Sequence, residues 1–100
     1  MKSAERKYLK GLAHRLKPIV FIGQSGLTAS VVRAVESVLN DHELIKVKFN
    51  DFREKEEKAG ITAAIEKQTG AEWIATIGHT AIIYRRHADP QRRKIKLPQK

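Results

Sequence analysis

The feature that most constrains the fold is a change of hydrophobic period at residues 19–41. Residues 19–22, "IVFI", are apolar at consecutive positions, which is typical of a strand buried on both faces. After "GQSG", apolar side chains recur at three- and four-residue spacing from about Thr28 to Asp41, which predicts an amphipathic helix. A strand that leads directly into a helix begins a crossover, so we expect the next strand to pair in parallel with the first.

The next segment alternates as a strand with one buried face does. Residues 43–50, "ELIKVKFN", place three apolar side chains on one face and put Lys46 and Lys48 on the other. This pattern predicts a strand whose second face is partly basic.

The N-terminal segment predicts an amphipathic helix at residues 4–16. Its apolar side chains recur at spacings of three and four, and Arg6 and Lys10 fall together on a neighbouring strip. Ser3 is the expected N-cap, and Pro18 ends the helix by forcing the residue before it toward extended geometry.

A third helix is predicted at residues 51–70. Asp51 is the expected N-cap, Glu54 stands three positions later as its capping-box partner, and Gly70 follows the last turn. Phe52 is expected on the apolar side of this helix.

The last regular element is a hairpin, "EWIATI-GH-TAIIYR", with Gly78 and His79 as a two-residue turn. The order is therefore α-β-α-β-α-β-β, an α/β (α+β) fold in which three helices pack on a four-stranded mixed sheet. We expect the parallel strands at the centre of the sheet. Residues 1–86 form one domain, and residues 87–100 are expected to be a basic, mobile tail.

The net charge of +9 is concentrated at the two ends of the chain. Residues 1–18 carry +5 and residues 85–100 carry +6, whereas residues 19–84 carry −2. This segregation is typical of a surface that binds a polyanion, so nucleic acid is the expected partner.

The two glycines after the first strand suit contact with phosphate. A Gly-x-x-Gly loop before a helix presents unpaired backbone N–H groups and the positive end of the helix dipole. Glycine also lacks the Cβ that would obstruct an approaching backbone, which is how KH domains clamp nucleic acid. Alone, however, two nearby glycines more often form a simple turn. The Gly-Lys-Ser/Thr ending of a P-loop is missing.

Two segments resemble a known family. "KPIVFIGQSGLTASVVRAVESVLNDHELIKVKF", residues 17–49, and "GHTAIIYR", residues 78–85, are similar to the CRM domain (chloroplast RNA splicing and ribosome maturation), and more narrowly to its free-standing bacterial YhbY-type members. The resemblance covers about residues 2–86. It implies a fold related to the C-terminal domain of translation initiation factor three, RNA binding, and association with precursors of the large ribosomal subunit.

The candidate RNA-binding residues come from the loop and from nearby cations. The resemblance transfers the GxxG positions to Gly23, Gln24, Ser25 and Gly26. Because the two middle positions are uncharged, neighbouring residues must supply the attraction for phosphate. Those neighbours are Thr28, Lys17, Arg33, Lys46, Lys48, Arg6, Lys10, Arg85 and Arg86.

The aromatic residues are too few for an obvious base-stacking platform. All six fit positions in the hydrophobic core or on an apolar helix face: Tyr8, Phe21, Phe49, Phe52, Trp73 and Tyr84. Shape and backbone recognition are therefore expected in preference to a linear sequence code.

No catalytic or metal site is predicted. The four histidines are scattered, and no cysteine is present to supply thiolate ligands. Ser25 does not lie in the sequence motif of a nucleophile elbow. Asp51 and the acidic residues after it are interpreted as a helix cap followed by a solvent-exposed helix face. We expect no enzyme activity, no cofactor and no small-molecule substrate. A phosphate-loop enzyme is the weakest alternative, and a general DNA- or RNA-binding regulator acting through basic tails is the stronger one.

The location of the protein is inferred from absent signals. The N-terminus lacks the apolar core of a signal peptide, and no apolar run approaches the length of a membrane span. We expect a cytoplasmic monomer without membrane contact.

Overall fold

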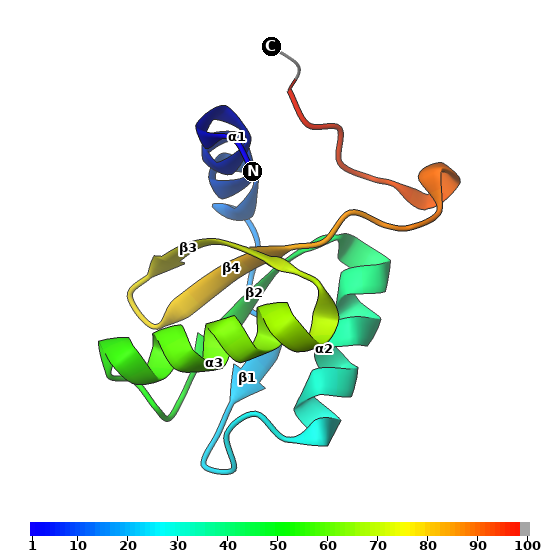
Figure 1. Cartoon of the computed structure of the whole chain (residues 1–100). Helices are drawn as coiled ribbons and strands as arrows, with labels where there is room; N and C mark the ends of the chain where they lie inside the picture. The colour runs from blue at the N-terminus through cyan, green and yellow to red at the C-terminus, as the bar shows by residue number, and fades with distance from the viewer. Residues whose placement is uncertain (99–100) are drawn as a thin grey trace.

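The computed structural model describes residues 1–98 and contains a single four-stranded mixed sheet between two layers (Figure 1). Helix α1 lies on one side of the sheet, and helices α2 and α3 lie on the other. The elements are α1 (Ser3–Ala13), β1 (Val20–Ile22), α2 (Ala29–His42), β2 (Leu44–Phe49), α3 (Lys55–Thr69), β3 (Glu72–Ile77), β4 (Thr80–Tyr84) and the 3₁₀ turn η1 (Pro90–Arg92). The predicted order of elements and fold class are confirmed.

The strand order in the sheet is β1-β2-β4-β3. β1 pairs with β2 in parallel, as the crossover predicts, and the remaining pairs are antiparallel. The parallel pair lies at one edge of the sheet and not at its centre, because the terminal hairpin inserts β4 beside β2. β1 and β3 are consequently the two edge strands.

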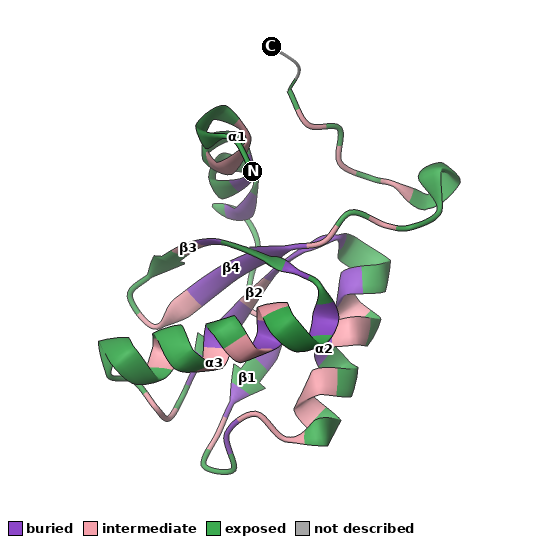
Figure 2. Ribbon diagram, viewed as in Figure 1, coloured by how far each residue is buried: buried purple, intermediate pink, exposed green. Residues whose placement is uncertain are grey.

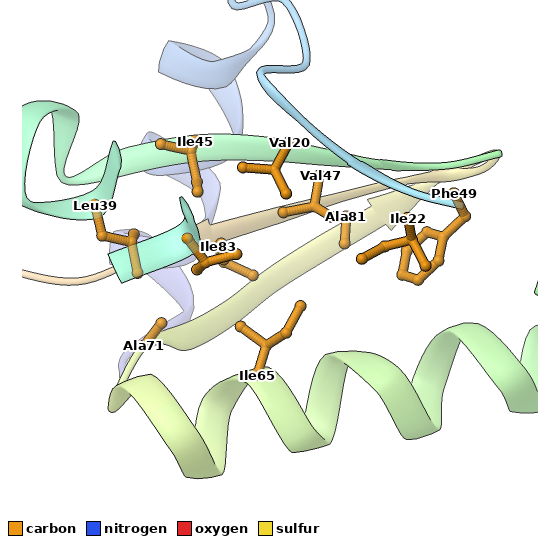
Figure 3. Close-up of a cluster of buried hydrophobic side chains, with 11 residues drawn as sticks. Val20, Ile22, Leu39, Ile45, Val47, Phe49, Ile65, Ala71, Ala81 and Ile83 are labelled. Atoms are coloured by element: carbon orange, nitrogen blue, oxygen red, sulfur yellow. The ribbon is translucent and has the colours of Figure 1, made fainter. Parts of the chain in front are cut away.

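The larger hydrophobic core lies between the sheet and helices α2 and α3 (Figures 2 and 3). Val35 and Leu39 of α2 and Ile65 of α3 are buried against the sheet. β1, β2 and β4 each contribute alternate residues to this core, in agreement with the period of two in β2. The sheet residues of the core are Val20, Ile22, Ile45, Val47, Phe49, Ala81 and Ile83.

A smaller core forms where α1 crosses the opposite face of the sheet. Leu9 and Ala13 of α1 are fully buried against one end of β2, β3 and β4. Ile95 and Leu97 from the C-terminal segment pack against the same cluster. α1 therefore covers only part of this face.

The C-terminal segment, predicted to be a mobile tail, makes specific contacts with the domain. Buried Glu43 accepts backbone N–H groups from His87, Lys94 and Ile95 at 2.7–2.9 Å. Burial opposes ionisation of Glu43, yet the three N–H donors and His87 hold its pKa below the usual value. In the structure, this carboxylate fastens residues 87–95 beside α1.

Two helices begin one or more residues away from the predicted positions. Lys2, not Ser3, is the N-cap of α1, and its backbone N–H donates to Glu5 Oε1 at 3.0 Å. α3 is capped by Glu54, not by Asp51. The N–H groups of residues 50 and 51 both donate to the Ile22 carbonyl, which ties that segment to β1 and delays the helix.

Candidate nucleic-acid interface

The GxxG loop joins the carboxyl end of β1 to the start of α2 (Figure 1). The Gly26 N–H donates to the Gly23 carbonyl at 3.0 Å, which closes a tight turn with Gln24 and Ser25 exposed at its tip. Gly26 has a φ of 69°, in the left-handed region where glycine is favoured. The tip of the loop therefore presents two uncharged polar residues to solvent, while Gly26 is buried.

The start of α2 favours a negatively charged ligand. The Thr28 hydroxyl accepts the Val31 N–H at 3.1 Å, so this candidate binding residue serves as the N-cap. The first turn of α2 contains no acidic residue, which leaves the positive end of its dipole without a compensating charge. Together, the loop and this helix end can hold a phosphate.

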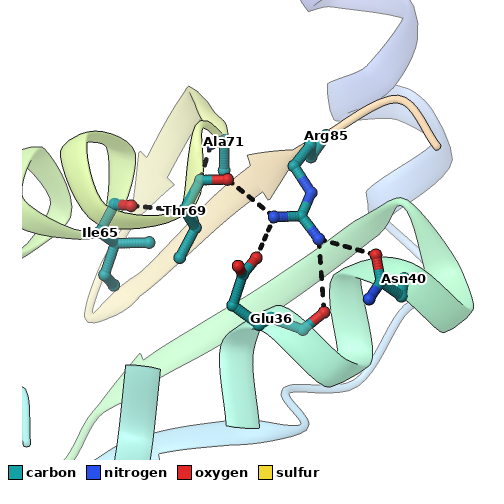
Figure 4. Close-up of polar contacts among 6 residues, drawn as sticks. All are labelled: Glu36, Asn40, Ile65, Thr69, Ala71 and Arg85. Atoms are coloured by element: carbon teal, nitrogen blue, oxygen red, sulfur yellow. Dashed lines mark hydrogen bonds and ion pairs between the residues drawn. The ribbon is translucent and has the colours of Figure 1, made fainter. Parts of the chain in front are cut away.

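Arg85 occupies a structural position, not an open one (Figure 4). Its guanidinium forms an ion pair with Glu36, donates to the Thr69 carbonyl at 2.7 Å and donates to Asn40 Oδ1 at 2.8 Å. Only 22% of the Arg85 side chain is exposed. The residue fastens the end of β4 to α2 and α3, so the prediction that it faces RNA is not supported by its contacts.

Two further candidate cations are also tethered to the protein. Arg6 donates to the Trp73 carbonyl, and its guanidinium lies 5.5 Å from the centroid of the Trp73 ring. Lys46 Nζ donates to the Leu16 carbonyl at 2.9 Å. Arg6 thus joins α1 to β3, and Lys46 joins β2 to the α1–β1 connection.

The remaining candidate cations are exposed but do not form a single surface. Lys10 is on α1, and Lys17 is in the connection that follows it. Lys48 is on the face of the sheet on which α1 lies. Arg33 lies on α2, in the opposite layer, and Arg86 follows β4 beside the C-terminal segment.

A groove of about 950 Å³ runs between α1 and the sheet. Among the basic residues that line the groove, Lys10 and Lys46 were predicted from the sequence to bind RNA. The prediction missed Lys7, His14 and Arg15. The spacing of residues 7, 10 and 14 is that of one helix face, so a helical projection of the basic residues would have found two of these three.

A second group of cations surrounds the β3–β4 turn. Lys58 Nζ donates to the Gly78 carbonyl at 2.5 Å and lies 3.2 Å from His79 Nδ1. Burial and the nearby charges of Arg53 and Lys58 lower the pKa of His79 below its usual value. Sequence analysis missed Arg53 and Lys58, because their proximity depends on how α3 packs beside the hairpin.

Three aromatic residues predicted to be packed are substantially exposed. The exposed fraction is 50% for Phe21, 41% for Tyr8 and 39% for Trp73. Phe21 is exposed because β1 is an edge strand and α1 does not reach across it. Phe49 and Tyr84 are buried, as predicted.

Other kinds of site find no support in the part of the chain that the structure describes. Among residues 1–98, no three His, Asp or Glu side chains gather where they would hold a metal ion. Within the same residues, none of the helices combines the length and the apolar character that crossing a membrane requires.

Comparison with known proteins identifies the family. Residues 1–85 match the CRS1/YhbY (CRM) domain. The chain belongs to this family. The family domain includes all three helices, the whole sheet and the GxxG loop, and it ends at Arg85.

Two relatives that align over most of their length have names that specify RNA binding. A Haemophilus influenzae protein named "RNA-binding protein" is 42% identical over 100 residues, covering 100% of this chain and 97% of the relative. A Pseudomonas aeruginosa protein named "Probable RNA-binding protein" is 33% identical over 88 residues, covering 88% of this chain and 84% of the relative. The solution structure of SAV1595 from Staphylococcus aureus, described as a candidate RNA-binding protein, superimposes with a TM-score of 0.83 at 28% identity. The alignment covers 98% of this chain and 99% of that one.

Proposed function

We propose that this protein binds RNA without catalysing a reaction and assists assembly of the large ribosomal subunit by associating with its precursors. The observation that carries the proposal is the GxxG loop, whose exposed tip stands at the uncompensated positive end of α2. The RNA-binding names of the relatives support the choice of RNA, and the CRM resemblance supports the choice of ribosomal precursors.

The loop and the basic surface have different roles in this proposal. The loop holds one phosphate through backbone N–H groups, which fixes the register of the RNA without reading its sequence. The exposed cations Lys10, Lys17 and Lys48 attract the flanking phosphates on α1's side of the sheet. Arg33 and Arg86 extend the positive potential toward the other sides of the molecule.

A second candidate function is general binding of DNA or RNA through the basic ends. Exposed Arg92, Lys94 and Lys96 in the C-terminal segment favour this candidate. Replacing these three by serine leaves Ile95 and Leu97 in the smaller core. If the second candidate function is correct, the triple variant loses nucleic-acid binding. Unlabelled DNA then displaces labelled RNA from the wild-type protein as effectively as unlabelled RNA does.

The proposed function is tested by sedimentation of the tagged full-length protein from gently lysed cells in low and moderate salt. We expect the protein to comigrate with large-subunit precursors and not with mature subunits. Recovery only at the top of the gradient, or together with DNA, would contradict the assembly role. The proposal also places the protein in the cytoplasm as a monomer. The molecular mass of the free protein in the top fractions tests this oligomeric state.

The proposal of a non-catalytic role has its own test. A phosphate-loop enzyme would hydrolyse nucleoside triphosphates in the absence of protein partners. We expect no turnover by the purified chain, with or without RNA.

A further inference from the structure

The face of the sheet on α1's side has a row of four side chains that α1 does not bury. Strand register pairs Phe21 with Lys48, Lys48 with Thr80, and Thr80 with Ile77, so these residues form one line across all four strands. With neighbouring strands about 4.8 Å apart, the line extends roughly 14 Å. We name Phe21, Lys48, Thr80 and Ile77 the cross-sheet row.

The two apolar members of the row are among the most exposed large hydrophobic residues of the protein. The exposed fraction is 50% for Phe21 and 55% for Ile77. The next line of residues along the strands contains Ile82, which is buried, and Lys46, which is half-buried. The row therefore marks the point at which the cover from α1 ends.

The row continues into surfaces that suit a polyanion. Thr80 and Ile77 also line the groove under α1, together with Lys7, Lys10 and Lys46, and none of the residues that line the groove is acidic. At the other end of the row, Phe21 precedes Gly23 by two positions and so lies beside the GxxG loop. A single strand of RNA laid along this path would meet the cations of the groove and Lys48, and would end at the GxxG loop.

We propose that the cross-sheet row is a platform for unpaired RNA bases, with Phe21 as the stacking surface and Ile77 as a second apolar contact. Lys48 and the groove cations neutralise the phosphates between the bases. This arrangement of exposed aromatic surface and basic groove is how single-stranded nucleic acid is held without sequence readout. The inference rests on the proposed RNA-binding function and adds the class of RNA segment that the site accepts.

The charge of the surface distinguishes RNA from a protein partner as the occupant. Protein–protein interfaces are depleted of lysine relative to the rest of the surface, whereas Lys48 lies within the row and Lys7, Lys10 and Lys46 line the adjoining groove. Base stacking also explains why an edge-strand phenylalanine is left open beside a phosphate-binding loop.

The platform is tested with two RNAs that share one hairpin. One hairpin is blunt, and the other carries a single-stranded extension containing 2-aminopurine. We expect Phe21→Ala to weaken binding of the extended RNA roughly 10-fold, the range produced by loss of one base–aromatic stack, and to change binding of the blunt hairpin less than about 2-fold. Phe21→Tyr retains a ring and should restore binding, and the matched control Tyr8→Ala removes an exposed aromatic outside the row.

The wild-type protein provides a second readout that does not depend on a variant. Stacking on Phe21 should quench 2-aminopurine fluorescence in the complex. Bound RNA with unchanged fluorescence, or equal losses for the two RNAs in Phe21→Ala, would overturn the platform.

Two other outcomes separate the platform from the proposed function. Failure of the wild-type protein to bind either RNA would contradict RNA binding itself. A Phe21→Ala protein that keeps full affinity for both RNAs but loses association with large-subunit precursors would overturn the platform and indicate a protein contact at the row.

Discussion

At the scale of single residues, the backbone of Gly26 limits which side chains the GxxG loop tolerates at this position. Its φ of 69° is strained for most side chains, and a Cβ at this position would lie 3.5 Å from the ring of Phe52. That distance is ordinary van der Waals contact, so a substitution here acts through backbone strain and through the charge it brings to the loop.

Gly26→Asp should weaken RNA binding while the protein remains folded. The carboxylate would repel the phosphate that the proposal places at the start of α2. Gly26→Asn is the matched control, because it adds a side chain of nearly the same size without charge, and Asn and Asp both tolerate the left-handed region. We expect Asp to lower the affinity several-fold relative to Asn, measured by titration with labelled RNA. Both variants should lose at most about 1–2 kcal/mol of stability, the penalty of the left-handed region for an ordinary side chain. Equal affinities for Asp and Asn would contradict the role of the loop.

Glu43 is a second residue with a structural role that its local sequence does not indicate. Its carboxylate accepts the N–H groups of His87, Lys94 and Ile95, and Glu43→Gln removes the charge and one acceptor oxygen. We expect a loss of about 1–3 kcal/mol in the free energy of unfolding. Hydrogen exchange at these three amides should become faster in the variant, and unchanged exchange would refute the contact.

The same carboxylate makes attachment of the C-terminal segment dependent on pH. The pKa of Glu43 is lowered in the folded protein from its ordinary value of 4.5, so its stabilisation is present above that pH. The contribution is lost as the pH falls below 4.5 and through the folded pKa. Amide exchange of the segment at acidic pH should approach that of Glu43→Gln, whose own attachment should change less over this range.

At the scale of elements, Arg85 and Arg86 are adjacent cations with different structural roles. Arg85 joins the end of β4 to α2 and α3, whereas Arg86 is exposed. Hydrogen bonds that involve charged groups contribute more to stability than neutral ones, so removing Arg85 loosens the packing of three elements.

Arg85→Ala should destabilise the protein by about 1–3 kcal/mol without reducing the RNA affinity of the molecules that remain folded. Arg86→Ala should leave the unfolding transition nearly unchanged and weaken RNA binding, because one fewer cation faces solvent. Urea unfolding and RNA titration of the two variants measure both quantities. A stable Arg85→Ala protein with reduced affinity would show that the sequence-based prediction for Arg85 was right.

At the scale of the whole molecule, charge determines how RNA affinity depends on salt. If six to eight phosphates are neutralised, log K should fall with log salt at a slope of roughly −4 to −7. Replacing Arg92, Lys94 and Lys96 by serine should reduce the magnitude of this slope by roughly 2 to 3 and preserve the preference for RNA over DNA. Titrations at several salt concentrations, with both nucleic acids, measure the slope and the preference. Loss of the preference in the triple variant would favour general binding through the basic ends.

The order of elements and the local turns were predictable from the sequence, because their causes lie within a few residues. The period of apolar side chains identified the three α-helices and the four strands but not the 3₁₀ turn η1, and Gly70 and Gly78 marked the end of α3 and the hairpin turn. The boundaries were less accurate where a distant contact intervened, as when the Ile22 carbonyl delayed the start of α3.

The position of each strand in the sheet, and with it the exposed surface, was decided only by tertiary structure. Phe21 is apolar and sits in an apolar run, yet it is open to solvent because β1 became an edge strand and α1 is too short to cover it. Arg85 meets Glu36 across 49 positions of the chain, and Glu43 meets His87 across 44. The sequence by itself therefore determined the elements, the basic ends and the glycine loop, through local preference and composition. The tertiary structure decided which cations are tethered and which aromatic residues are exposed, because both depend on contacts between residues far apart in the chain.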